Sequence, residues 1–261
     1  MKISILKKAL VFAFMLFLAV LKAQETKPEF YQLKTYTFNN EEQEQTTDHY
    51  LEKAFLPALK RQGINTVGVF KLRAAYNSTA NKTYVLIPFS DLSSFQNLEA
   101  KLEQDAAYAA DGKVYLGASH EKPPYQRISS VLMKAFKDMP QMKSPKFEGE
   151  TKDRVYELRS YEGPTENYYK RKVHMFNEGG EIPLFESLGF NAVFFAEVLA
   201  GEQMPNLMYM TTFENMDSRE AHWKAFFSSE KWDEIKDLPQ YKNTVSQADI
   251  ILLYPTEYSD Y

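Results

Sequence analysis

The heptapeptide Val155-Tyr156-Glu157-Leu158-Arg159-Ser160-Tyr161 (VYELRSY) occurs a second time in the 261-residue chain, in diverged form. Its counterpart, Phe30-Tyr31-Gln32-Leu33-Lys34-Thr35-Tyr36 (FYQLKTY), lies 125 positions earlier and keeps both tyrosines and the leucine. Further matches follow in the same order: His49 with His174, Leu56-Pro57 with Ile182-Pro183, and Gly63-Ile64-Asn65 with Gly189-Phe190-Asn191. An ordered series of matches at a nearly constant offset predicts a tandem duplication.

Each copy predicts the element order β-α-β-β-α-β. The alternating residues of both heptapeptides indicate a first strand. A helix over Thr47–Gln62, with Thr47 and Asp48 as capping residues, is expected to kink or break at Pro57 and to end at Gly63. Gly179-Gly180 and Pro183 predict a break at the matching place in the second copy. A second helix is expected at 92–109 in one copy and at 216–235 in the other. The other expected strands are Ile64–Leu72, Thr83–Phe89 and Ile128–Ala135 in the first copy, and Phe190–Leu199, Leu207–Phe213 and Asp249–Tyr254 in the second.

This element order is typical of a ferredoxin-like (βαββαβ) α+β unit, whose sheet carries helices on one face only. Sheet faces rich in aromatic residues are not left in water, so the two copies are expected to cover each other. The expected result is an internal pseudo-dimer with an eight-strand, barrel-like core and the helices outside. The predicted domains are residues 24–136 and 154–261, and residues 137–153, which are rich in proline and charge, form the linker.

The first 23 residues have the pattern of a secretory signal peptide. Three lysines precede an apolar run, Ala9–Val20, that is too short to span a bilayer comfortably. A small residue, Ala23, predicts cleavage before Gln24, and an uncleaved anchor helix is the alternative. We therefore expect export across the inner membrane, into the periplasm of a Gram-negative source, and no membrane contact after cleavage.

Charge and cysteine content exclude several classes of site. Cleavage would move the formal charge from −4 to −8, because residues 1–23 contain four lysines and no acidic residue. An acidic chain without a basic patch predicts no nucleic-acid partner. The absence of cysteine rules out disulfides, thiolate metal sites and cysteine nucleophiles, so packing must supply the stability. No metal site is predicted.

The start strand VYELRSY resembles that of the NIPSNAP family. Ile182-Pro183 with Gly189, and Phe226-Phe227-Ser228-Ser229-Glu230-Lys231-Trp232, also resemble this family. The resemblance covers residues 154–255 well and residues 29–136 more loosely, since Gln32 and Lys34 replace the glutamate and the arginine. It implies a dimeric α/β barrel, here formed within one chain. It implies no established reaction, although relatives in the superfamily include cofactor-free monooxygenases and haem-dependent enzymes.

Several side chains are candidates for a site. Period-2 alternation places Glu157, Arg159 and Tyr161 on one face of their strand, where they form either a structural ion pair or a ligand site with Arg159 as a carboxylate clamp. The first-copy equivalents are the weaker set Gln32, Lys34 and Tyr36. The remaining candidates are His174 (catalytic, with Tyr161), its first-copy equivalent His49, and Trp223 and Trp232. The alternatives are surface positions for the two histidines and core packing for the two tryptophans.

Three functions are compatible with these residues. The first is binding of a small, partly apolar molecule between sheet and helix, with Arg159 and Tyr161 as polar anchors. The second is an oxidoreductase of the cofactor-free monooxygenase or haem-dependent type, with His174 as base or iron ligand. The third is a structural protein that self-associates through exposed strand edges and forms a homo-oligomer. No cofactor is predicted from the residues alone, and haem enters only through the second function.

Overall fold

The computed structural model describes residues 26–73, 76, 81–145, 147 and 150–261. The predicted signal peptide and its cleavage site lie outside the described residues. Among the helices within these ranges, none is long and apolar enough to cross a bilayer.

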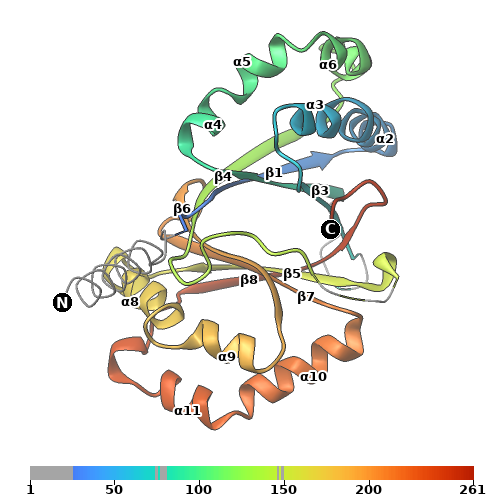
Figure 1. Cartoon of the computed structure of the whole chain (residues 1–261). Helices are drawn as coiled ribbons and strands as arrows, with labels where there is room; N and C mark the ends of the chain where they lie inside the picture. Colours follow the sequence, from blue (N-terminus) through green and yellow to red (C-terminus); the bar gives the residue numbers. More distant parts are fainter. Residues whose placement is uncertain (1–25, 74–75, 77–80, 146, 148–149) are drawn as a thin grey trace, which may run out of the picture.

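Eight strands form one closed barrel in the order β1-β3-β2-β8-β5-β7-β6-β4 (Figure 1). All the neighbouring strands pair in antiparallel fashion. The strands are β1 (Phe30–Phe38), β2 (Gly68–Leu72), β3 (Asn81–Phe89), β4 (Arg127–Ala135), β5 (Val155–Glu162), β6 (Asn191–Ala200), β7 (Asn206–Phe213) and β8 (Gln247–Pro255). The prediction of an eight-strand α+β barrel is therefore confirmed.

The two halves of the chain contribute strands in the same relative order, β4-β1-β3-β2 and β8-β5-β7-β6. Two seams join the halves: β2 pairs with β8, where Lys71 lies opposite Tyr254, and β4 pairs with β6, where Lys134 lies opposite Glu197. Every described strand has a neighbour on both sides, but the seams are short: the paired residues are Phe70–Leu72 with Leu253–Pro255, and Leu132–Ala135 with residues of β6. Self-association through exposed edges, as the third hypothesis requires, therefore stays a prediction.

Helices cover the barrel on two opposite sides, one layer for each half (Figure 1). The first layer comprises α2 (Glu41–Tyr50), a π-helical turn (Leu51–Phe55), α3 (Leu56–Arg61), α4 (Leu92–Gln96), α5 (Leu98–Glu103), α6 (Ala106–Asp111) and α7 (Lys113–Leu116). The second comprises α8 (Glu166–Phe176), α9 (Glu181–Ser187), α10 (Met216–Phe227) and α11 (Glu230–Lys236), with short 3₁₀ turns at Thr151–Asp153 and Pro239–Tyr241.

The first helix begins six residues before the predicted start. Asn40 caps α2 by accepting the backbone N–H of Gln43, whereas Thr47 lies buried inside the helix and donates to the carbonyl of Pro124 at 2.7 Å. The regular α-helix is interrupted but does not end before Pro57: the π-helical turn leads directly into α3, and Phe55 and Leu56 keep helical dihedral angles. Gly63 ends the segment with φ +83°, a conformation that favours glycine.

Other boundaries changed for local reasons. The strand expected from Ile64 begins only at Gly68. The single helix expected over 92–109 is divided into α4, α5 and α6, and Asp105 starts the last of them by accepting the N–H of Tyr108. Ser229 caps α11 in the same way, so the helix expected over 216–235 is two helices. Serine and aspartate compete for backbone donors and therefore favour new caps over helix continuation.

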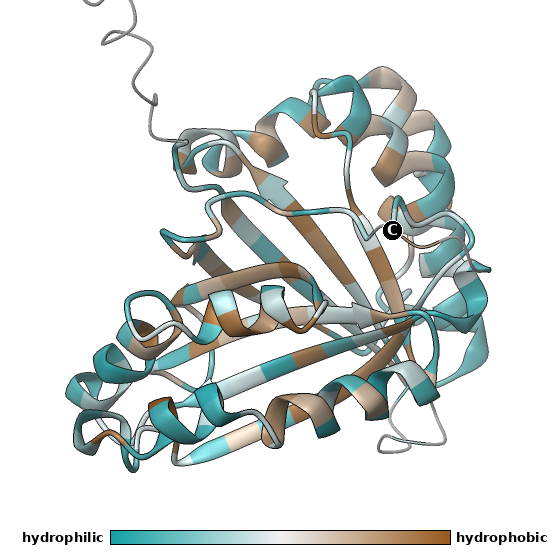
Figure 2. Ribbon diagram, turned by 60° about the horizontal axis from the view of Figure 1, so that its bottom comes forward, coloured by the Kyte–Doolittle hydropathy of each residue, from teal (hydrophilic) through white to brown (hydrophobic). Residues whose placement is uncertain are grey.

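The buried side chains form one core inside the barrel, one under each helix layer, and a small separate cluster of Met175, Ile235 and Tyr241. Tyr31, Leu33, Phe70, Tyr156 and Leu158 belong to the interior core. Their sequence neighbours point outward to the helices, as the alternation predicts. Figure 2 shows the resulting mixture of hydrophobic and hydrophilic bands along the strands and helices.

The residues after β8 fasten the second half to the first. Lys60 pairs with Asp260 at 2.6 Å, and Tyr258 donates to Asp48 at 2.9 Å. Tyr261 is only 4% exposed and packs in the barrel interior against Phe70. The halves are thus joined by two strand seams and by this terminal segment.

Candidate functional site

Glu157 is the centre of a polar network between β5 and the second helix layer. Its side chain is fully buried. One carboxylate oxygen accepts from Arg159, at 2.6 Å from Nε and 2.5 Å from Nη2. The other accepts from Arg219 Nε at 2.6 Å and from Trp223 Nε1 at 2.9 Å. This carboxylate therefore ties the strand to α10 through charge-assisted bonds.

Arg159 connects that carboxylate to a pair of tyrosines. Its Nη1 donates to Tyr161 at 2.8 Å, the hydroxyls of Tyr161 and Tyr209 lie 2.9 Å apart, and its guanidinium stacks 3.7 Å from the Trp223 ring centre. Burial on its own would lower the pKa of Arg159, but the two tyrosines and Glu157 hold that pKa above its ordinary value. Burial also raises the pKa of Tyr209. The arginine thus stays charged in an aromatic environment.

A second buried ion pair lies beside this network. Lys172 of α8 contacts Glu181 of α9 at 2.8 Å, and both side chains are almost fully buried. The Lys172 ammonium also lies 4.7 Å from the ring centre of Phe176. This pair joins α8 to α9 across the predicted break at Gly179-Gly180, which the structure confirms.

The structure brings Glu157, Arg159, Tyr161 and Trp223 together, but not His174. His174 is exposed and its Nδ1 lies 2.7 Å from the Tyr241 hydroxyl. His49 is exposed on α2. Trp232 is half-buried and packs on Phe226, with ring centres 4.8 Å apart, at the edge of the network.

The first-half equivalents form a different environment. Lys34 makes no ion pair with a described residue, lies 5.1 Å from the Phe55 ring centre, and has its pKa lowered by burial. Burial raises the pKa of the adjacent Tyr36. Lys34 therefore occupies the position equivalent to Arg159, but it has no carboxylate partner like Glu157 among the described residues.

Haem does not fit around His174. The layer beneath α8 is filled by rings in direct contact: Phe176 lies 5.3 Å from Tyr209, and Phe185 lies 4.8 Å from Phe226, between ring centres. The histidine faces away from this layer and is bonded to Tyr241. In the described ranges no group of three or more histidine, aspartate or glutamate side chains could hold a metal ion.

A cavity of about 520 Å³ opens at one end of the barrel. Its apolar lining includes the interior residues Leu33, Leu158 and Met208. Nearer the opening, the lining becomes polar and includes Ser129 and Ser160. None of these residues was singled out from the sequence, because a strand pattern does not show which inward positions lie at an open end.

Asn206 is a buried polar residue of this cavity. It is 2% exposed, and its Nδ2 donates to Ser160 Oγ at 2.7 Å. Its Oδ1 is buried and has no hydrogen-bond partner among the described residues. A buried acceptor without a partner costs about 1–3 kcal/mol, so a donor supplied by a ligand or by water would stabilise this end of the barrel.

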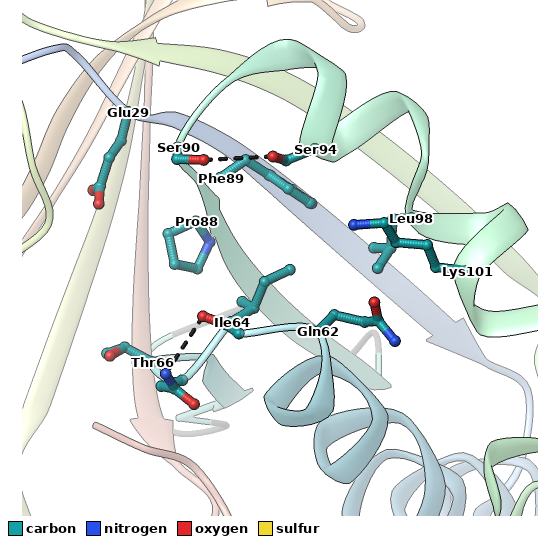
Figure 3. Close-up of a pocket in the computed structure, with 12 residues that line it drawn as sticks. Glu29, Gln62, Ile64, Thr66, Pro88, Phe89, Ser90, Ser94, Leu98 and Lys101 are labelled. Atoms are coloured by element: carbon teal, nitrogen blue, oxygen red, sulfur yellow. Dashed lines mark hydrogen bonds between the residues drawn. The ribbon is translucent and has the colours of Figure 1, made fainter. Parts of the chain in front are cut away.

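A smaller cavity of about 340 Å³ lies between the end of α3 and the start of α4 (Figure 3). Glu29 and Lys101 lie at its opposite sides, with Ile64 and Pro88 between them. The Glu29 carboxylate already accepts the backbone N–H of Met142 at 2.8 Å. Its acidic group is therefore engaged within the chain, which makes this the weaker candidate.

Comparison with known proteins agrees with the resemblance noted in the sequence. Residues 156–260, in the second half of the chain, match the model of the NIPSNAP family. No functionally curated protein matches the chain significantly.

Several solved structures share the fold over most of the chain. A candidate monooxygenase from Fusobacterium nucleatum is 12% identical, with 88% of this chain and 93% of that chain covered and a TM-score of 0.57. A candidate monooxygenase from Lactobacillus acidophilus is 8% identical, with 88% and 94% covered and a TM-score of 0.57. An anthrone oxidase-like protein is 8% identical, with 90% and 94% covered and a TM-score of 0.52. At these identities the likeness shows the fold, a closed eight-strand α+β barrel, and not the activity.

Proposed function

We propose that this protein binds a small, partly apolar molecule in the cavity at the end of the barrel. The observation that carries the proposal is a cavity of about 520 Å³ with an apolar inner lining and a buried, unpartnered acceptor, Asn206 Oδ1. Binding sites for small molecules combine a mostly apolar wall with a few placed polar groups, in a volume of about 300–1,000 Å³.

This site differs from the one expected between sheet and helix. There, Glu157 uses both oxygens on Arg159, Arg219 and Trp223, and the surrounding rings pack directly on one another. A ligand would have to break charge-assisted bonds and displace aromatic side chains. On our proposal, Arg159 and Tyr161 therefore hold the sheet to its helices, and the ligand binds inside the barrel.

Thermal-shift screening tests the proposal. A library of small acids, amines, amides and alcohols with apolar bodies is tested against the wild type, the cavity-filling variant Ser129→Phe, and the control Ser228→Phe on the exposed end of α10. A ligand at about 100 times its Kd adds about 2.7 kcal/mol of stability. The shift should occur in the wild type and the control and be lost in Ser129→Phe. A ligand shift that survives Ser129→Phe, or no shift with any compound, contradicts the proposal.

An oxidoreductase is the second candidate, favoured by the fold shared with two candidate monooxygenases and by the buried arrangement of Tyr161, Tyr209 and Trp223 around Arg159. Oxygen uptake with hydroxylated aromatic compounds tests it, with Tyr161→Phe as the variant expected to lose the activity. Uptake that is absent, or unchanged in Tyr161→Phe, counts against it. Haem titration followed at the Soret band tests the haem-dependent form, for which His174 offers no suitable pocket.

Export remains part of the proposal. The described residues begin after the predicted cleavage site, so the N-terminal pattern alone supports it. Expression of the full chain in a Gram-negative host, followed by mass measurement of the periplasmic fraction, should give a chain that starts at Gln24. Retention of residues 1–23 would favour the anchor helix instead.

A further inference from the structure

The opening of the barrel cavity carries separated charges of opposite sign. Lys82 of β3 and Arg127 of β4 both line it, and each lies directly opposite Thr37 of β1, one on either side. The first half of the chain therefore contributes two cations to one side of the opening.

The second half contributes two anions to the other side. Asp249 of β8 lies opposite Ser160 of β5, and Glu202 lies in the connection between β6 and β7. Strands β8, β5, β7 and β6 are consecutive in the barrel, just as β3, β1 and β4 are, so the two charge pairs come from different arcs of its wall. The opening therefore has a positive and a negative side.

These four charges are not neutralised by ion pairs within the described residues. Neither Lys82 nor Arg127 has a carboxylate partner there. Among the residues that the structure describes, Asp249 accepts from the neutral amides of Gln203, at 3.3 Å, and Gln247, at 3.1 Å. Pairing between these opposite charges would be electrostatically favourable. Because they lie apart, the cations and the anions can each contact a charged group of a ligand.

We infer that the ligand is a zwitterion with an apolar body, of the size of an apolar amino acid or a dipeptide. Its carboxylate would face Lys82 and Arg127, and its ammonium group would face Asp249. The ammonium or amide N–H would also supply the donor that Asn206 Oδ1 lacks, and the apolar side chains would lie against Leu33, Leu158 and Met208. This inference rests on the proposed function and adds the ligand class to it.

Four related probes separate the contributions of the two charges. They are L-leucyl-L-leucine, its N-acetyl derivative without the ammonium group, its C-terminal amide without the carboxylate, and the N-acetyl amide without either charge. Affinity is measured by calorimetry on the full protein. Loss of either charge should weaken binding at least about tenfold, and the doubly neutral probe should bind weakest.

Charge-neutralising variants locate each contact. Asp249→Asn should weaken the free dipeptide about tenfold while leaving the N-acetyl probe unchanged, and Arg127→Gln should weaken the free dipeptide while leaving the C-terminal amide unchanged. Glu234→Gln, on exposed α11, is the matched control and should alter no affinity. Thermal melting of each free variant establishes that it is folded.

The outcomes distinguish this inference from the proposed function. If the neutral probe binds as tightly as the dipeptide, and Ser129→Phe still abolishes binding, the cavity is a binding site but the ligand is not a zwitterion. If neither the dipeptide nor L-leucine binds while a library compound without both charges does, the inference is again wrong and the proposed function stands. If neither the dipeptides nor any library compound bind, both are wrong.

Discussion

Replacing Glu157 by glutamine should remove much of the stability of the second half. The substitution keeps the shape of the side chain but removes the charge that faces Arg159 and Arg219. It also replaces one acceptor oxygen by an NH₂ group, which is a hydrogen-bond donor and cannot accept from the N–H groups that face it. The fully buried position allows no compensation by solvent.

The magnitude follows from the burial. Removing one partner of a buried ion pair costs about 3–5 kcal/mol, because the remaining charge stays buried. Arg219 is one-fifth exposed and can turn toward water, whereas Arg159 is 8% exposed and cannot. We therefore expect a loss of about 3–5 kcal/mol in the free energy of unfolding, and a fall in Tm of roughly 6–20 °C.

Urea unfolding followed by tryptophan fluorescence measures this loss. Both tryptophans of the chain, Trp223 and Trp232, lie in or beside the network, so the signal reports on the second half. Glu234→Gln makes the same chemical change at an exposed pair with Lys231 and should cost less than about 0.5 kcal/mol. A cost for Glu157→Gln within about 1 kcal/mol of that control would refute the reasoning.

Three further predictions concern other parts of the barrel. Arg159→Met should destabilise the protein by about 3–5 kcal/mol, whereas Lys34→Met at the equivalent position should be neutral or stabilising by up to about 1 kcal/mol in urea unfolding, because Lys34 has no carboxylate partner among the described residues. Burial raises the pKa of Tyr84 to about 12 in the folded state, above its ordinary value near 10. The stability that the protonated hydroxyl contributes is therefore fully present below pH 10 and is lost between pH 10 and 12. Melting curves recorded across this range should show the fall in Tm, and Tyr84→Phe should reduce it. Tyr261→Ala should cost about 3–5 kcal/mol in chemical unfolding, because the ring is packed inside the barrel, and a cost below about 1 kcal/mol would show that the terminal segment is not fastened there.

The order of elements could be predicted because it depends on local patterns. VYELRSY and FYQLKTY alternate as strands do, and Gly63 and Gly189 each supply a positive φ after a helical segment. Both halves then show the predicted order of strands and helices. That this order arose by duplication, and that each half is a ferredoxin-like unit, remain predictions.

Helix starts were predicted less well. The segment Glu41–Gln45 is polar throughout and carries no apolar stripe, yet Asn40 caps it and Gln43 donates to the carbonyl of Pro123. The hydroxyl of Thr47, interpreted as a cap, instead bonds a loop 77 residues later. Contacts at such separations have no local signal in the sequence.

The site was predicted in part. Alternation placed Glu157, Arg159 and Tyr161 on one face, but it could not show that this face meets the helices. Arg219 and Trp223, four residues apart on one helix, could have been recognised as partners of a buried acid. Asn206 carried no such signal, because its importance depends on its position at the open end of a barrel.

Cysteine cross-linking at both seams tests most directly whether the two halves close into one barrel. The chain contains no cysteine, so Lys71→Cys with Tyr254→Cys marks only the β2–β8 seam, and Lys134→Cys with Glu197→Cys marks only the β4–β6 seam. Each pair lies opposite across antiparallel strands, where side chains are close enough for a disulfide after modest adjustment. Peptide mass spectrometry after oxidation should show an intramolecular disulfide at each seam. A disulfide at one seam but not the other would mean an open sheet, and would contradict the closed barrel.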